Sequence, residues 1–151
     1  QGNYLYQYYR GWPWSHGGYR TLSSEDRKDR TNWGRAFVGV VVHRLDGFVS
    51  ADAPQEGGYL VTPPLLFDGH CLELNIDVSG MGGALVEIQD ERGQPISGYT
   101  LDDCDRILQN DVAYVVHWKG NPDVSWLAGK PVRLKIALRS SKLFAFQFNG
   151  N

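Results

Sequence analysis

Hydrophobic and polar residues alternate along much of the chain from residue 35 onward. The alternation is clearest at 72–78 and 132–138, where every second side chain is Val, Leu or Ile. This period of two is typical of a β-strand that has one face on a core and the other toward water. We predict strands at 35–45, 48–53, 58–66, 71–79, 84–91, 96–101, 112–119, 131–139 and 142–149.

Short turns rich in glycine and aspartate separate most of these segments. Asp46-Gly47 is a strong turn signal between two apolar runs, because glycine adopts a positive φ without steric cost. We expect it to form a tight corner near the start of an antiparallel β-domain. Evenly spaced short strands without helical periodicity favour an all-β, antiparallel, jelly-roll-like β-sandwich of about eight or nine strands.

The first 34 residues differ from the rest of the chain. Tyr4–Tyr9 has strong strand propensity, and the residues after it read as a loop because proline and a glycine pair interrupt any ladder. We therefore divide the 151 residues into 1–34, a strand with an aromatic loop, and 35–151, the β-sandwich domain.

Composition narrows the classes of partner. The net charge of −2 gives no electrostatic reason to expect nucleic acid or an anionic membrane as a partner. No apolar run approaches the roughly 20 residues of a membrane helix. Because the chain begins at Gln1 rather than at methionine, we expect either a removed leader or a piece of a longer protein.

Aromatic residues gather in and beside the first loop. Exposed Trp and Tyr rings stack on the apolar faces of sugars, and nearby Arg and His donate hydrogen bonds to hydroxyl groups. This pattern predicts a site for a polysaccharide or oligosaccharide, and the alternative is that the same rings cover a neighbouring domain. The predicted ligand-binding residues are Arg10, Trp12, Trp14, His16, Tyr19 and Trp33.

The densest group of carboxylates is Asp102, Asp103 and Asp105, with Asp111 a few residues later. Ca²⁺ takes six to eight oxygen ligands, so these residues are a candidate calcium site, although their spacing does not match an EF-hand. The alternative is that they are solvated or cap backbone amides. We expect no other cofactor.

Cys71 and Cys104 permit one disulfide, and two buried free thiols are the alternative. No phosphate loop, dinucleotide fingerprint or Gly-x-Ser-x-Gly motif is present. Nothing in the sequence pairs two carboxylates for glycoside hydrolysis. A lyase that uses Tyr9 or Tyr19 as acid, helped by His16 or Arg20, is the remaining enzymatic alternative.

A series of short motifs along residues 35–149 resembles a known type of domain. The motifs are Arg44–Ser50, Gly57-Gly58 with Thr62-Pro63, Leu72–Asn75, Gly98–Cys104, Val116–Gly120, Leu127–Lys135 and Leu143–Phe148. Together they resemble the C-terminal β-sandwich domain of secreted bacterial, planctomycete-type proteins of the glycoside hydrolase family 32/43-like group. In that group the sandwich follows a five-bladed β-propeller, and Tyr4–Tyr9 is similar to the last propeller strand.

The resemblance implies an accessory domain without a catalytic centre of its own, secreted or periplasmic, and part of a glycoside hydrolase. It implies a catalytic domain of the same parent protein as a partner. The long aromatic segment Trp12–Trp33 departs from the pattern of the group. We therefore expect a non-catalytic carbohydrate-binding module, with a purely structural domain that packs on a propeller as the alternative.

Overall fold

The computed structural model describes residues 2–11, 23–25 and 37–150 of the chain. It divides into two compact units, Gln1–Leu45 and Asp46–Asn151, and each is considered by itself. The division falls next to the Asp46-Gly47 turn, in which Asp46 rather than the glycine has the positive φ, at 51°. The strand predicted at 35–45 therefore belongs to the first unit, not to the sandwich.

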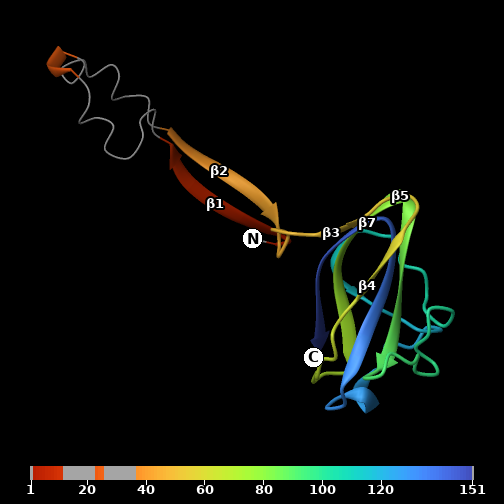
Figure 1. The fold of residues 1–151 in the computed structure, drawn as a ribbon. Coiled ribbons are helices and arrows are strands. Elements are labelled where there is room, and N and C mark those ends of the chain that lie inside the picture. Colours follow the sequence, from red (N-terminus) through yellow and green to blue (C-terminus); the bar gives the residue numbers. More distant parts are fainter. Residues whose placement is uncertain (1, 12–22, 26–36, 151) are drawn as a thin grey trace. The chain divides into compact units, whose positions relative to one another are not determined.

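The first unit contains a two-stranded antiparallel ribbon (Figure 1). Strand β1 (Tyr4–Gly11) pairs with β2 (Phe37–Arg44) along its whole length. Tyr6 lies opposite Val42, and Tyr8 lies opposite Val40, so tyrosines face valines on one side of the ribbon. Most of these side chains are exposed on both faces.

Two aromatic rings of the ribbon lie across glycines of the facing strand. A Cβ on Gly39 would stand 2.6 Å from the ring of Tyr9, and a Cβ on Gly11 would stand 2.3 Å from the ring of Phe37. The two rings also meet edge to face, with 5.9 Å between their centroids. The glycines thus leave room for the rings, a pairing that supports a narrow sheet.

The second unit is an antiparallel β-structure in which one sheet holds all the strands, with β7 paired to β3, β4 and β5, and β6 paired to β5 (Figure 1). The strands are β3 (Ala51–Ala53), β4 (Gly58–Val61), β5 (Cys71–Asp90), β6 (Asp111–Val115) and β7 (Val132–Asn149), with a short 3-10 helix, η3, at Ser125–Leu127. This confirms the predicted all-β, antiparallel, sandwich-like fold.

Strands β5 and β7 are long enough for each to contribute one half to each of the two layers of the sandwich. They pair from Cys71–Asn149 to Val78–Ser141, and again from Gly83–Arg139 to Asp90–Val132. Between these stretches, Ser140 alone faces four residues of β5, and its φ is 43°. The double strand folds over at this point, so the predicted strand pairs 71–79 with 84–91 and 131–139 with 142–149 are each one bent strand.

The core lies between the two halves of the bent β5–β7 strand pair. Alternate residues of β5 and β7 point inward, including Leu72, Leu74, Val86 and Ile136, which are fully buried. A register shift between the pairs Asn75–Ala145 and Ile76–Leu143 leaves one extra residue, Phe144, in β7. This bulge changes which residues of β7 face inward, from Leu143 to Phe146 and Phe148.

Four predicted strands are shorter or absent. The strand predicted at 112–119 is β6, which covers only Asp111–Val115. Strand β3 covers only 51–53 of the predicted 48–53, and β4 covers 58–61 of 58–66, where Pro63 and Pro64 cannot continue a ladder. Residues 96–101 turn instead of extending, with Gly98 at a φ of 88°. The segment still contacts the edge of β5, because Ile96 donates to Ile88 and Ile88 donates to Tyr99.

Candidate functional site

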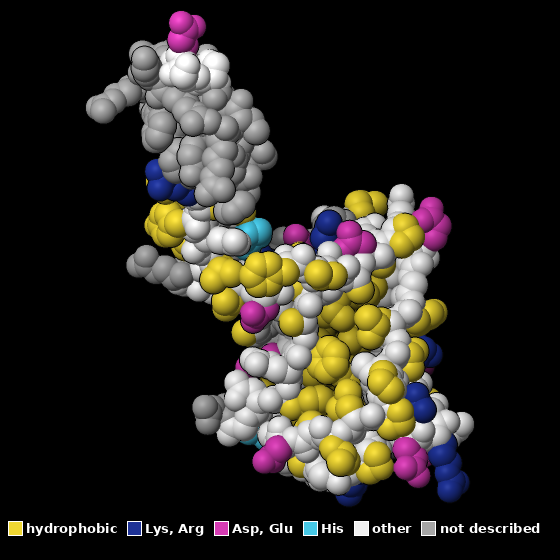
Figure 2. Space-filling model, turned by 60° about the vertical axis from the view of Figure 1, so that its left-hand side comes forward, with side chains coloured by type: hydrophobic (Ala, Val, Ile, Leu, Met, Phe, Trp, Pro, Cys, Tyr) yellow, Lys and Arg dark blue, Asp and Glu magenta, His cyan; other side chains and the backbone are white. Residues whose placement is uncertain are grey.

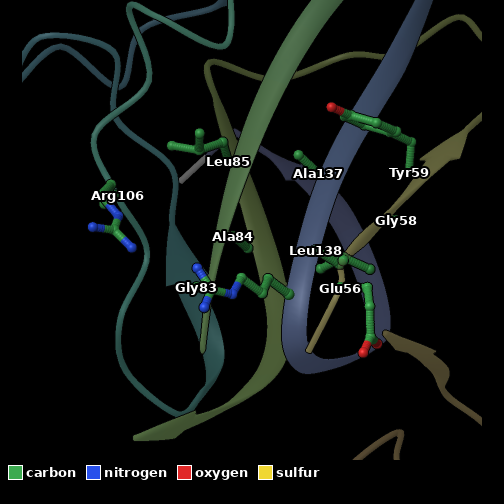
Figure 3. A pocket seen from close by; sticks show the side chains of 11 residues that line it. Glu56, Gly58, Tyr59, Gly83, Ala84, Leu85, Arg106, Ala137 and Leu138 are labelled. Atoms are coloured by element: carbon green, nitrogen blue, oxygen red, sulfur yellow. The ribbon is translucent and has the colours of Figure 1, made fainter. Parts of the chain in front are cut away.

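A groove of about 300 Å³ lies on the outer surface of the sandwich, across β4, β7 and β5 (Figure 3). Its size is at the lower end of the roughly 300–1,000 Å³ typical of small-molecule sites. Its lining combines one aromatic ring, two arginines, one carboxylate and a floor of small residues. The lining residues are Glu56, Gly57, Gly58, Tyr59, Gly83, Ala84, Leu85, Arg106, Ala137, Leu138 and Arg139.

Tyr59 provides the aromatic surface of the groove. It pairs across the sheet with Ala137, which in turn pairs with Leu85, so the three side chains form one outward row. Figure 3 shows the ring of Tyr59 over β7 beside Ala137. The side chain is 69% exposed, because its neighbour in the row is a single methyl group. A flat ring on an open sheet face is suited to stacking against the apolar face of a ligand.

Lys135 and Glu87 stabilise the row next to Tyr59. Lys135 Nζ lies 5.0 Å from the centroid of the Tyr59 ring and 3.9 Å from Glu87 Oε1. The Glu87 carboxylate is buried and also accepts hydrogen bonds from Gln89 Nε2 at 2.8 Å and from the Leu101 amide at 3.2 Å. This network fixes the lysine beside the ring and satisfies the buried acid.

Arg139 and Arg106 form the other part of the groove, around Gly83. Arg139 faces Gly83 across the sheet, and its Nε donates to the carbonyl of Gln55 at 3.1 Å. Arg106 precedes Ile107, which bridges to Ala84, so the arginine stands just beyond the edge of β5. A Cβ on Gly83 would lie 3.5 Å from Arg106 Nη2. This is an ordinary van der Waals distance, so the guanidinium packs beside the backbone of β5 at Gly83.

A second exposed ring, Trp126, is less open. Its Nε1 donates to the hydroxyl of Tyr99 at 2.8 Å, and that hydroxyl donates to the Asp123 carbonyl at 2.6 Å. Lys130 Nζ lies 4.6 Å from the centroid of the Trp126 ring. Both rings therefore have a lysine beside them, but Tyr59 is the more exposed of the two, at 69% against 52%, and it alone borders the groove.

Most of the aromatic site predicted from the sequence falls outside the described residues, namely Trp12, Trp14, His16, Tyr19 and Trp33. Arg10 is described, and it lies on β1 opposite Val38. The prediction that these residues bind a glycan stays a prediction. Tyr9, one of the two candidate acids for a lyase, has its ring beside Phe37 and across Gly39.

The acidic residues predicted as calcium ligands make local contacts. Asp103 pairs with Lys119 and accepts from Thr100 Oγ1 at 2.8 Å, and these contacts lower its pKa from 3.8 to about 2, the lysine contributing most. Asp105 accepts from the Gly120 amide, and Asp111 accepts from the Ala113 amide. No three His, Cys, Asp or Glu side chains among the described residues form a group that could hold a metal ion, and this includes Asp102.

The two cysteines are buried free thiols. Cys104 Sγ accepts from the Val86 amide at 3.2 Å, and burial raises the pKa of this thiol to about 11. Burial likewise raises the pKa of Cys71. Because the thiolate is the reactive form, these shifts keep both thiols protonated at neutral pH and make neither a strong nucleophile.

Sequence reasoning missed the groove because its parts come from separate segments. Tyr59 follows a glycine pair and alternates with Leu60, so its outward direction was readable from the strand pattern. The approach of Arg106 and Arg139 depends on the pairing of β5 with β7 and with the segment around Ile107. The spacing of residues along the sequence does not predict which of these strands pair.

No family model, curated protein or solved structure matches this chain. Among the described residues, no helix has the length and apolar character needed to cross a membrane. The features that bear on function are the groove, the exposed side chains of the β1–β2 ribbon, and the hydrophobic side chains that gather on one face of the second unit (Figure 2).

Proposed function

We propose that this chain is a non-catalytic, carbohydrate-binding β-sandwich module of a carbohydrate-active enzyme, and that the Tyr59 groove binds the glycan. The observation that carries the proposal is an exposed ring on a flat sheet face with arginine and carboxylate side chains in the same groove. Sugars are recognised by this combination of an apolar platform and a few placed polar groups.

The groove lacks the features of a hydrolytic site. Glu56 is the one carboxylate in its lining, whereas glycoside hydrolysis ordinarily uses a pair. Glu87 lies close by, but it is buried and bound to Lys135, Gln89 and the Leu101 amide. This arrangement supports binding rather than bond cleavage. The module would act beside a catalytic domain of a secreted or periplasmic parent protein, as its resemblance to such modules implies.

Affinity electrophoresis against plant, algal and microbial polysaccharides tests the proposal. We expect retardation of the wild-type chain, with a dissociation constant from micromolar to millimolar, or about −8 to −4 kcal/mol. Tyr59→Ala should abolish retardation. Phe48→Ala is the matched control, because Phe48 is also an exposed ring of the second unit but lies outside the groove. Equal retardation of wild type and Tyr59→Ala would overturn the site.

The same gels distinguish the two aromatic sites and test whether binding requires a metal ion. A loss of retardation in Trp12→Ala or Trp14→Ala, with Tyr59→Ala unaffected, would move the site to the first loop. Sensitivity to EDTA would show that binding needs a metal ion, although the described carboxylates, those of Asp102, Asp103, Asp105 and Asp111 included, form no group that could hold one. Binding that is unchanged in EDTA would show that the glycan site works without calcium.

The ribbon β1–β2 favours a second candidate function, a structural domain that packs against a catalytic domain. Both of its faces expose tyrosine and valine side chains, Tyr8 and Val40 on one face and Tyr9 and Val41 on the other, and an isolated two-stranded sheet is marginal in water. This candidate predicts that the chain self-associates and binds no glycan. Sedimentation of the wild type and of Tyr8→Lys would test it, and two monodisperse monomers would contradict it.

A further inference from the structure

The Tyr59 groove carries more positive than negative charge. Its lining contains Arg106 and Arg139 but a single carboxylate, Glu56, although the whole chain has a net charge of −2. Figure 3 shows Arg106 on one side of the central strands and Glu56 with Tyr59 on the other. The excess of positive charge is therefore local to the groove, on the side of Gly83.

The two arginines differ from ordinary surface cations in how they are held. The Nε of Arg139 is bound to the Gln55 carbonyl, which fixes the guanidinium against the turn before β4. The guanidinium of Arg106 packs beside Gly83, where an added Cβ would lie 3.5 Å from Nη2. Among the described residues, Arg106 has no hydrogen-bond or ion-pair partner, and Arg139 has no carboxylate partner.

Neighbouring acids do not neutralise these arginines. Glu87 is bound to Lys135, Gln89 and the Leu101 amide. Glu56 is exposed and makes no ion pair with a described residue. Guanidinium groups bind carboxylate and sulfate oxygens through paired N–H donors, which a neutral hydroxyl cannot match.

The distance between Tyr59 and Arg106 sets a minimum length for a ligand that contacts both. Tyr59 lies on β4 and Arg106 lies beyond β5, with β7 between these strands, so about three strand spacings of 4.8 Å each separate them. A sugar ring that stacks on Tyr59 cannot itself reach Arg106. The anionic group must belong to another position of an oligosaccharide.

We propose that the groove selects an anionic glycan: one sugar stacks on Tyr59, and a carboxylate or sulfate further along the chain binds Arg139 and Arg106. This inference rests on the proposed function, and it adds the chemical class of the ligand. Both acid groups have the required oxygens, so the experiment must distinguish uronic acids from sulfated sugars.

Matched pairs of polysaccharides provide the test. Wild-type chain is titrated with polygalacturonate and its methyl ester, and with dextran sulfate and dextran, at low and at physiological salt. We expect the charged member of at least one pair to bind about tenfold more tightly, and this preference to weaken as salt screens the charges. The pair that shows the preference identifies carboxylate or sulfate as the recognised group.

Variants distinguish specific binding of the anionic group by the groove arginines from general electrostatic attraction of the polysaccharide to the protein. Arg106→Gln and Arg139→Gln should each lower affinity for the charged polysaccharide about three- to tenfold and leave the neutral one unchanged. Arg92→Gln removes the same charge from an exposed turn outside the groove, and it should change nothing. An equal loss in Arg92→Gln would overturn the inference.

The remaining outcomes distinguish this inference from the proposed function. Equal binding of charged and neutral polysaccharides, abolished by Tyr59→Ala, would overturn the anionic preference and keep the carbohydrate site. A charge preference that survives both Arg106→Gln and Arg139→Gln would place the anion site elsewhere and overturn the inference. Absence of binding to every polysaccharide would overturn both proposals.

Discussion

The β1–β2 ribbon and the strand pair β5–β7 are both rich in residues with high strand propensity, but their side chains have different surroundings. In β5 and β7, alternate residues such as Leu74 and Ile136 are fully buried, because the pair folds over and covers its own inner face. In the ribbon, Tyr8 and Val40 are exposed. Strand propensity is thus sufficient to pair two strands, but a second layer is required to bury them.

This comparison predicts first that truncation to alanine costs far more in the sandwich than in the β1–β2 ribbon. Ile136→Ala should lower the free energy of unfolding by about 2–5 kcal/mol, because it leaves a cavity in the core of the sandwich. Val40→Ala in the ribbon should change it by less than about 0.5 kcal/mol. Urea unfolding of both variants measures the difference. Similar losses would mean that the ribbon is buried in the native protein.

The fold-over point is the next most sensitive position. Gly82→Ala should cost about 1–3 kcal/mol, because the added Cβ would stand 2.4 Å from the Ser140 carbonyl oxygen and 2.5 Å from that of Arg139. Gly80→Ala is the matched control, since nothing lies within 4 Å of a Cβ there. Thermal melts of the two variants provide the measurement. Equal melting temperatures would show that β5 and β7 do not approach closely at the bend.

Asp103 gives a smaller effect that depends on pH. Its pKa is lowered from 3.8 to about 2, mainly by Lys119, so its stabilising contribution is complete above about pH 4 and is lost as the pH falls toward 2. Asp103→Asn should therefore be less stable than wild type at pH 7 and equal to it near pH 2. Lys119→Met should lose part of the same pH dependence. Parallel stability profiles from pH 7 to pH 2 would contradict the assignment.

The smallest effect should come from removing the ribbon altogether. All members of the hydrophobic core lie between residues 53 and 148, within the second unit. A chain of residues 46–151 should therefore fold and unfold in urea within about 0.5 kcal/mol of the full chain. The Tyr59 groove belongs to this unit, so glycan binding should also persist. Loss of folding would show that the sandwich depends on the first 45 residues.

Much of the fold was predictable because the relevant signals are local. Alternation at 72–78 and 132–138 identified half-buried strands, and the inward residues are those that the alternation indicated. The bend was not predictable, since glycines at 80, 82 and 83 read equally well as a hairpin turn between two strands. Only the common partner, β7, shows that 71–90 is continuous.

The site was harder to predict than the fold for a related reason. A lone Tyr59 or a lone Arg106 has no diagnostic neighbours in the sequence, and the groove exists because three pairings bring them onto one face. The contacts of Asp103 and Asp105 could be anticipated better. Aspartates in tight turns commonly cap amides, and this was the alternative to calcium.

The nested pairing of β5 with β7 also bears on how the chain folds. Asp90 pairs with Val132 at the inner end, and Cys71 pairs with Asn149 at the outer end. Once Asp90 and Val132 have paired and closed the loop between them, each further pair costs little additional loop-closure entropy. Pairing of β5 with β7 can therefore proceed outward from that end. The first closure must be made against a long intervening segment, which makes slow nucleation the expected rate-limiting event. The two layers would then form in sequence, with the half next to Asp90 first and the half next to Cys71 second.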